Sequence, residues 1–186
     1  MDHGQFSTVP GLGAAPRVLV VQPSRSYVTM LAHRIAEAGY RVVTAEDAQS
    51  ALAEMHRARP DVVLAELTLK RTTGVELVQL VREDSARRDL PLIMMAGRSE
   101  AGCAVRALQA GADDVVRKPY HFEVLVARIA RQIARARALK ELRDANAALD
   151  ARVVTRAIEL GEVRHRLAQS EAERQRLETL VAARAA

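Results

Sequence analysis

The fold is decided by the stretch Pro60-Asp61-Val62-Val63-Leu64-Ala65-Glu66-Leu67, in which four apolar residues in a row lie between two acidic ones. A short apolar run without polar alternation is typical of a strand that is buried on both faces. Two similar runs precede it, at residues 17–21 and 41–44, and two follow it, at residues 92–95 and 115–116. Such strands belong to parallel sheets that helices cover on both sides.

Amphipathic segments connect these runs and predict helices over residues 24–38, 46–59, 73–82, 99–110 and from 121 onward. Gly39 and Gly111 follow two of these segments, where a left-handed residue commonly ends a helix. Thr73 and Glu76 have the spacing of a capping box. Strands that alternate with helices in this way predict a doubly wound α/β fold with a five-stranded parallel sheet.

The candidate site lies at one edge of this sheet, because ligands of such folds bind at the carboxyl ends of the strands. The residues at these ends are Gln22, Pro23, Glu66, Ala96 and Lys118. Only two of them are charged, and the five histidines lack metal-binding spacing. We therefore expect neither a metal centre nor a cofactor.

Composition excludes several classes of protein. The 186 residues are 49% hydrophobic and 27% charged, with a formal net charge of +5, as in ordinary globular chains. Aromatic residues make up 3% and tryptophan is absent, which argues against a base-stacking surface for single strands. A single cysteine excludes an intrachain disulfide framework. The sequence has neither a membrane-length apolar run nor a secretory start, so we expect a cytoplasmic protein without a membrane partner.

The last third of the sequence has a different pattern. With Leu139 as position a of a heptad, nine of the fourteen a and d positions are apolar. These nine residues, which we call the seam, are Leu139, Leu142, Leu149, Val153, Leu160, Val163, Leu167, Leu177 and Val181. The pattern predicts a coiled coil of about 75 Å that continues the fifth helix. The expected organisation is a flexible lead at 1–16, a globular domain at 17–137 and a coiled-coil helix at 138–186.

The polar residues of the heptads bear on the partner. Asn146 at an a position favours a two-stranded coil in register. Parallel pairing would bring Glu159 near Arg164 of a second copy, whereas Glu173 would face Glu178. The balance favours a parallel homodimer, and the alternative is a helix that folds back on its own chain.

Several runs resemble the receiver domains of bacterial response regulators, over about residues 17–137. The most specific is Gly111-Ala112-Asp113-Asp114-Val115-Val116-Arg117-Lys118-Pro119-Tyr120, and the others lie at 18–21, 60–67, 74–77 and 91–95. The resemblance implies a flavodoxin-like receiver fold in a two-component system. Residues 149–160 also resemble linkers that join sensory modules to histidine kinases or diguanylate cyclases.

The chemistry expected of that family is not matched. Receivers hold Mg²⁺ with two acidic residues after the first strand, where this chain has Gln22 and Pro23. They accept a phosphoryl group on an aspartate after the third strand, where Glu66 stands here. The hydroxyl residue after the fourth strand is Ala96, and the aromatic switch residue of the fifth strand is Val115. Of the residues compared, the resemblance preserves only the lysine, as Lys118.

We therefore predict that no acyl phosphate forms by the usual mechanism and that the domain is not an enzyme. Mg²⁺ prefers carboxylate oxygens, and phosphoryl transfer depends on the charge that the metal neutralises. Two interpretations of Glu66 remain open. Its longer side chain either imitates the phosphorylated state by reaching Lys118, or forms an ion pair that satisfies an inherited pocket.

Three functional hypotheses follow. The first is a pseudo-receiver that dimerises through its coil and acts as an adaptor for an unidentified kinase or output protein. The second is a regulatory segment of a larger histidine kinase or diguanylate cyclase, with the coil as transmitter. The third uses the basic residues of the stretch 128–143, notably Arg128, Arg131 and Arg135, to bind a nucleotide or DNA. No helix-turn-helix follows this stretch, so nucleic acid is the disfavoured partner.

Overall fold

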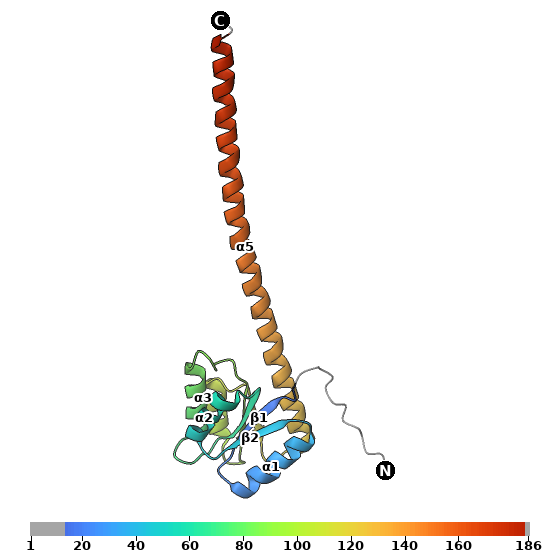
Figure 1. The fold of residues 1–186 in the computed structure, drawn as a ribbon. Helices are drawn as coiled ribbons and strands as arrows, with labels where there is room; N and C mark the ends of the chain where they lie inside the picture. The colour runs from blue at the N-terminus through green and yellow to red at the C-terminus, as the bar shows by residue number, and fades with distance from the viewer. Residues whose placement is uncertain (1–13, 185–186) are drawn as a thin grey trace. The chain divides into compact units, whose positions relative to one another are not determined.

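The computed structural model describes residues 14–184, and the predicted lead lies almost wholly outside them. Strands and helices alternate along the described chain (Figure 1). Their bounds are β1 (Arg17–Val21), α1 (Arg25–Glu37), β2 (Arg41–Ala45), α2 (Ala48–Ala58), β3 (Val62–Glu66), α3 (Gly74–Glu83), β4 (Leu92–Ala96), α4 (Ala101–Gln109), β5 (Asp114–Arg117) and α5 (Phe122–Arg184).

The five strands form one parallel sheet in the order β2-β1-β3-β4-β5. The order reverses direction between β1 and β3, which pair side by side with Val21 opposite Ala65. The carboxyl ends of these two strands therefore meet at the switch point, where such sheets bind ligands. The predicted doubly wound receiver fold is confirmed.

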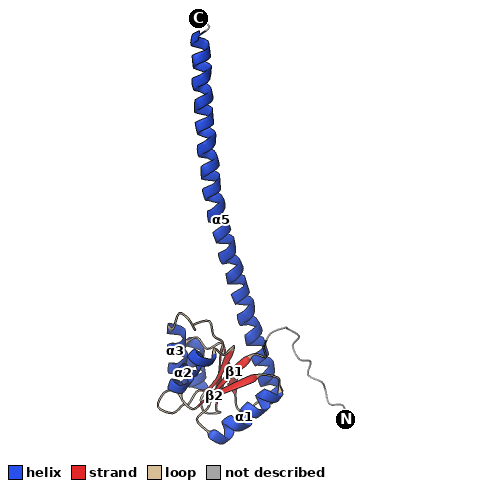
Figure 2. Ribbon diagram, in the orientation of Figure 1, coloured by secondary structure: helices blue, strands red, loops and turns tan. Residues whose placement is uncertain are grey.

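Helices flank the sheet (Figure 2). Two apolar layers, one on each face, hold the sheet between them. Because successive strand residues point to opposite faces, Val63 and Ala65 pack toward α2, α3 and α4, while Val62 and Leu64 pack toward α1 and α5. All four are fully buried. This two-sided burial is the physical reason why the strands show no polar alternation.

Most of the predicted helix boundaries hold. Gly39 and Gly111 adopt φ values of 90° and 106°, and Thr73 with Glu76 forms the predicted capping box at the start of α3. The helix predicted from residue 46 begins instead at Ala48, because Asp47 caps it through the backbone N–H of Ser50 at 2.8 Å. Gly74 is required for a different reason, since a Cβ there would lie 2.5 Å from the carbonyl oxygen of Glu66.

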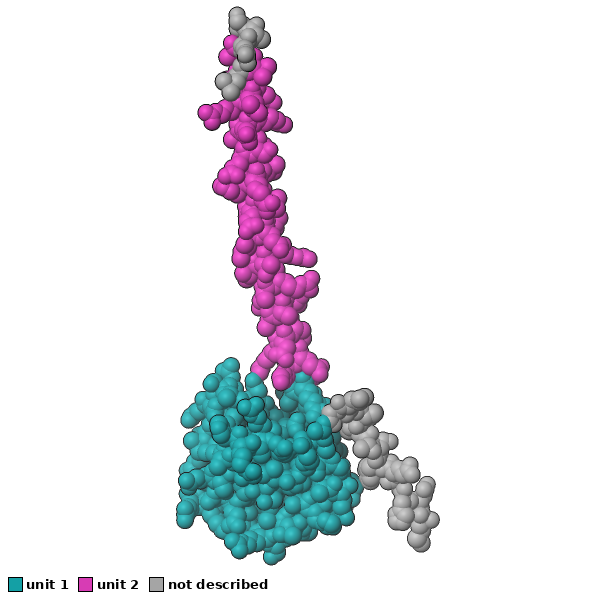
Figure 3. Space-filling model, in the orientation of Figure 1, with its two compact units in different colours: residues 1–137 teal, residues 138–186 magenta. Residues whose placement is uncertain are grey.

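The chain divides into two compact units, Met1–Arg137 and Ala138–Ala186 (Figure 3). In the first unit, α5 buries Leu125, Ile129 and Ile133 against the sheet. In the second unit the nine seam residues are all solvent-exposed, from 46% at Leu139 to 69% at Val181. Within residues 14–184, no helix is long and apolar enough to cross a bilayer.

Candidate functional site

Glu66 is the last residue of β3, and its carboxylate lies at the switch point. The residue is only 7% exposed. Its Oε1 atom accepts a hydrogen bond from Nε2 of Gln22 at 2.6 Å and forms a short ion pair with Nζ of Lys118. A buried carboxylate needs such partners, because an unpaired charge in the interior is strongly unfavourable. The predicted contact between Glu66 and Lys118 is therefore present.

Gln22 follows β1, and its backbone and side chain are both engaged. Its backbone N–H donates to the carbonyl of Ala45 at 2.9 Å. Its side-chain oxygen accepts from the backbone N–H of Ser24 at 3.1 Å, which leaves the amide nitrogen to donate to Glu66. The amide thus presents a donor, not an oxygen ligand, toward the carboxylate.

The three remaining candidate residues, Pro23, Ala96 and Val115, contribute no polar side chain. Ala96 ends β4 and is fully buried, so a methyl group stands where the carboxyl end of this strand meets the site. Val115 lies in β5 and packs against the core shared with α2, α3 and α4. Pro23 is partly buried and carries no side-chain donor or acceptor. The polar contacts of the site therefore come from Gln22, Glu66 and Lys118.

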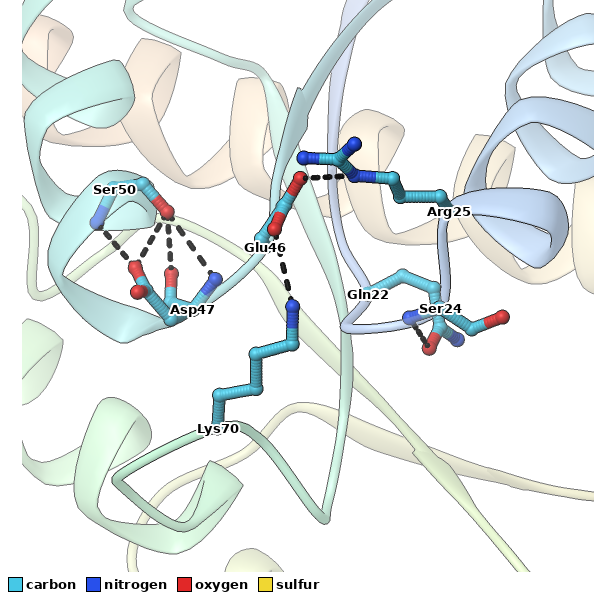
Figure 4. A network of polar contacts seen from close by, with 7 residues as sticks. All are labelled: Gln22, Ser24, Arg25, Glu46, Asp47, Ser50 and Lys70. Atoms are coloured by element: carbon cyan, nitrogen blue, oxygen red, sulfur yellow. Dashed lines mark hydrogen bonds and ion pairs between the residues drawn. The ribbon is translucent and has the colours of Figure 1, made fainter.

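A second polar network lies beside this site and was not predicted from the sequence. Glu46 follows β2 and forms ion pairs with Arg25 at 3.2 Å and with Lys70 at 3.1 Å (Figure 4). The hydrogen bond from Lys70, followed by that from Arg25, lowers the pKa of the exposed Glu46 carboxyl below 4.5. Glu46 could have been found from the sequence, because it follows a strand. The expectation that site residues lie at the carboxyl ends of strands identified Gln22 and Glu66, and it applies equally to Glu46.

The basic stretch is partly occupied by contacts within the domain. Nη1 of Arg128 lies 2.7 Å from both carboxylate oxygens of Asp114. Arg137 pairs with Asp61 at 3.3 Å. Arg131 and Arg135 are exposed. The structure thus gives Arg128 a role in fixing α5 to the start of β5, and both Arg128 and Arg137 are paired with acidic residues of the domain.

The comparison with protein families bears on this geometry. The family model of the response regulator receiver domain matches residues 18–130, which is more than half of the chain. The chain belongs to the response regulator receiver family.

Three proteins illustrate the relationship. PhoB of Escherichia coli strain K12, a phosphate regulon transcriptional regulatory protein, is 34% identical over 115 residues, or 62% of this chain and 50% of PhoB. The chain thus spans about half the length of the curated relatives it matches. The chemotaxis response regulator CheY4 of Vibrio cholerae is 31% identical with a TM-score of 0.59, covering 63% of this chain and 98% of CheY4. The signal receiver domain of a histidine kinase from Syntrophus aciditrophicus is 26% identical with a TM-score of 0.61, covering 64% of this chain and 91% of that one.

The residues at the switch point do not suit the divalent cation that receivers use. A hard cation needs carboxylate or carbonyl oxygens. The Oε1 atom of Glu66 already accepts from an ammonium and an amide group, and the Gln22 oxygen is turned to the backbone of Ser24. Within residues 14–184, no group of three or more histidine, cysteine or acidic side chains is arranged to hold a metal ion. The chemical effect of this arrangement is that the Glu66 carboxylate and the Lys118 ammonium group neutralise each other.

Proposed function

We propose that this receiver does not undergo phosphorylation by the aspartate and Mg²⁺ mechanism, is not an enzyme, and acts as a dimeric signalling adaptor in the cytoplasm. Its partners would be a kinase or an output protein of a two-component or second-messenger pathway. The receiver would supply a docking face, and a parallel coiled coil of residues 138–186 would hold two such faces together.

One observation carries the first part of the proposal. Glu66 stands where receivers have the phosphoacceptor, and its buried carboxylate is engaged by both Lys118 and Gln22. Attack on a phosphodonor requires an oxygen in line with the phosphorus and a cation to neutralise the transferred charge. Here the lysine neutralises the glutamate itself. The ammonium group that would neutralise a transferred phosphoryl group is therefore already paired with the carboxylate, and no second acidic side chain stands at Gln22 or Pro23 to hold a cation.

The test is incubation of the full chain with acetyl phosphate and Mg²⁺, followed by intact-mass measurement. We expect no gain of a phosphoryl group, whereas a receiver with aspartate at this position and two acidic residues after its first strand serves as the positive control. A stoichiometric mass gain that is lost in Glu66→Gln would contradict the proposal.

The support for the coil is the exposure of its seam. On a single helix nine large apolar side chains remain in water, at a cost of about 25 cal/mol per Å² of apolar surface. Pairing with a second copy would bury them, and Asn146 would set the register. The second part of the proposal thus rests on a repeated pattern and not on any one contact.

A matched pair of substitutions tests the coil in the full chain. Leu160 lies in the seam and Ile158 does not, yet their side chains are 57% and 60% exposed. Leu160→Glu should convert a dimer to a monomer in sedimentation equilibrium, while Ile158→Glu should leave the dimer intact. Equal effects of the two substitutions, or a monomeric parent chain, would refute a homodimer formed through this seam.

A second candidate function is regulation within a larger signalling protein. It is favoured by the receiver of the Syntrophus histidine kinase, which this chain matches over 91% of that receiver's length. The coil would then transmit a signal to a kinase or cyclase domain. Sequencing of the coding region beyond the codon for Ala186 distinguishes this candidate from the adaptor, because it requires an open reading frame that continues into such a domain.

A further inference from the structure

A pocket of about 320 Å³ opens between α1 and the segment that joins β5 to α5. It is separate from the carboxylate at the switch point, although Lys118 borders both. Its lining includes Tyr27, Met30, Arg34, Lys118, Tyr120 and Phe122. A volume of this size is typical of sites for small organic molecules.

The pocket gathers most of the few aromatic rings in the chain. The whole sequence contains three tyrosines and two phenylalanines, and three of these five residues line this one pocket. Tyr27 comes from α1, whereas Tyr120 lies between β5 and α5 and Phe122 is the first residue of α5. The hydroxyl groups of Tyr27 and Tyr120 form a short hydrogen bond to each other, which joins the two sides of the pocket. Three aromatic residues around one pocket suit a planar ligand, because aromatic pairs stabilise each other by stacking or edge contacts.

Two cations line the same pocket, each held over one of the rings. The guanidinium carbon of Arg34 lies 4.0 Å from the centroid of Phe122, and Nζ of Lys118 lies 4.5 Å from the centroid of Tyr27. The ion pair of Arg34 with Glu123 is long, at 3.8 Å, and the Arg34 side chain is 46% exposed. A guanidinium group in this setting remains available to bind a carboxylate or phosphate group.

We propose that this pocket binds a small planar anion, namely an aromatic ring that carries a carboxylate or phosphate group. The ring would lie among Tyr27, Tyr120 and Phe122, and the anionic group would pair with Arg34 and approach Lys118. The pairing of rings with cations is the observation that selects an anionic aromatic ligand over an aliphatic or a cationic one.

Lys118 links this pocket to the switch point. Its ammonium group lies between the Glu66 carboxylate and the ring of Tyr27. An anion in the pocket would compete with Glu66 for the same ammonium group, so removal of the Glu66 charge should strengthen binding. Any effect of this competition on signalling rests on the proposed function, whereas binding of the anion can be measured without it.

Isothermal titration of the full chain with naphthoate, an aromatic carboxylate, tests the proposal, with the neutral naphthol as the comparison. We expect saturable binding of one naphthoate per chain and binding of naphthol that is at least about tenfold weaker, because the neutral molecule gains nothing from the cations. Non-saturable heat, or equal affinity for the two molecules, would overturn the proposal. Neither result depends on whether the chain is phosphorylated or dimeric.

Matched variants locate the site. Met30 lines the pocket and is 44% exposed, so it tolerates polar replacement. Met30→Glu should weaken naphthoate binding by about tenfold through charge repulsion, while Met30→Gln should bind as the parent chain does. Arg34→Ala should weaken binding, and Arg57→Ala, which removes a more exposed, acid-paired arginine of α2 that does not line the pocket, should not. Equal affinities for Met30→Glu and Met30→Gln would place the ligand elsewhere.

The link to Lys118 has its own measurement. Glu66→Gln should bind naphthoate several-fold more tightly than the parent chain, because the competing carboxylate is gone. Unchanged or weaker binding in Glu66→Gln would show that Lys118 does not take part, and would reduce the site to Arg34 and the rings.

Discussion

Replacement of Lys118 by methionine tests the central ion pair most directly. Methionine keeps most of the length and apolar volume of the lysine stem but removes the ammonium group. Glu66 would then keep its single hydrogen bond from Gln22 and lose its cation. Because the Glu66 side chain is 9% exposed, water cannot replace the missing partner.

The magnitude follows from the burial of the two partners. Removal of one member of a fully buried ion pair costs about 3–5 kcal/mol. The Lys118 side chain is 31% exposed, which places this pair at the lower end, at about 3 kcal/mol. Glu66→Gln removes the charge that needs compensation and should cost only about 1 kcal/mol. The double variant should cost about the same as Glu66→Gln alone, which leaves a coupling free energy with a magnitude of about 3 kcal/mol.

Urea unfolding monitored by near-ultraviolet circular dichroism is a suitable assay. The three tyrosines and Phe122 lie in the receiver domain, and residues 138–186 contain no aromatic side chain, so the coil does not contribute to the signal. Lys70→Met provides the matched control, because Lys70 and its partner Glu46 are 51% and 45% exposed and their pair should contribute less than about 1 kcal/mol. A Lys118→Met variant that loses no more stability than Lys70→Met would refute the argument from burial.

Three further predictions follow from local geometry. Gly74→Ala should destabilise the receiver domain by roughly 3 kcal/mol in the same urea assay. The new Cβ would lie 2.5 Å from both the Glu66 carbonyl oxygen and the Met94 methyl group. Gly102→Ala is the control, and it should be neutral or slightly stabilising because a Cβ at Gly102 meets open space. The lowered pKa of Glu46 stabilises the fold above its ordinary value of 4.5, and this contribution disappears as the pH falls through the folded pKa; Glu46→Gln should therefore show a smaller loss of thermal stability in acid than the parent chain. Burial raises the pKa of Tyr120, so its stabilising contribution is complete below pH 10 and declines at higher pH; phenolate absorbance should show this tyrosine ionising only with unfolding, and Tyr120→Phe should flatten the alkaline loss of stability.

The fold could be predicted because its decisive signals are local. The apolar runs at β1, β3 and β4 correspond to strands that are buried on both faces, and the spacing of Thr73 and Glu76 marked the start of α3. The start of α2 was misplaced by two residues, since Asp47 acts as a cap and Glu46 pairs with Lys70 instead of entering the helix. Boundaries of this kind depend on which of two acidic neighbours turns toward the backbone, and composition does not encode that choice.

The site was predictable only in part, because side-chain orientations and contacts between distant residues leave no local signal in the sequence. The strand-end rule identified Glu66 and Lys118, because parallel strands bring their carboxyl ends to one edge of the sheet. The orientation of the Gln22 amide depends on a backbone N–H two residues away, which is a three-dimensional detail. The aromatic pocket could not be predicted, since Tyr27 and Tyr120 are separated by 93 residues and meet only when α1 packs beside the end of β5. Pairing of the coil remains a prediction from the heptads.

The position of Lys118 connects the two proposals about this chain. A switch requires two states of similar free energy and an input that binds them unequally. In this receiver the anion beside the lysine is supplied by the chain itself, through a glutamate fixed at the end of a buried strand. Unlike a phosphoryl group, the Glu66 carboxylate is part of the chain, so hydrolysis does not remove it from Lys118. A competing anion in the aromatic pocket is therefore the one input, among those that this geometry supports, that could alter the contacts of Lys118 without covalent chemistry.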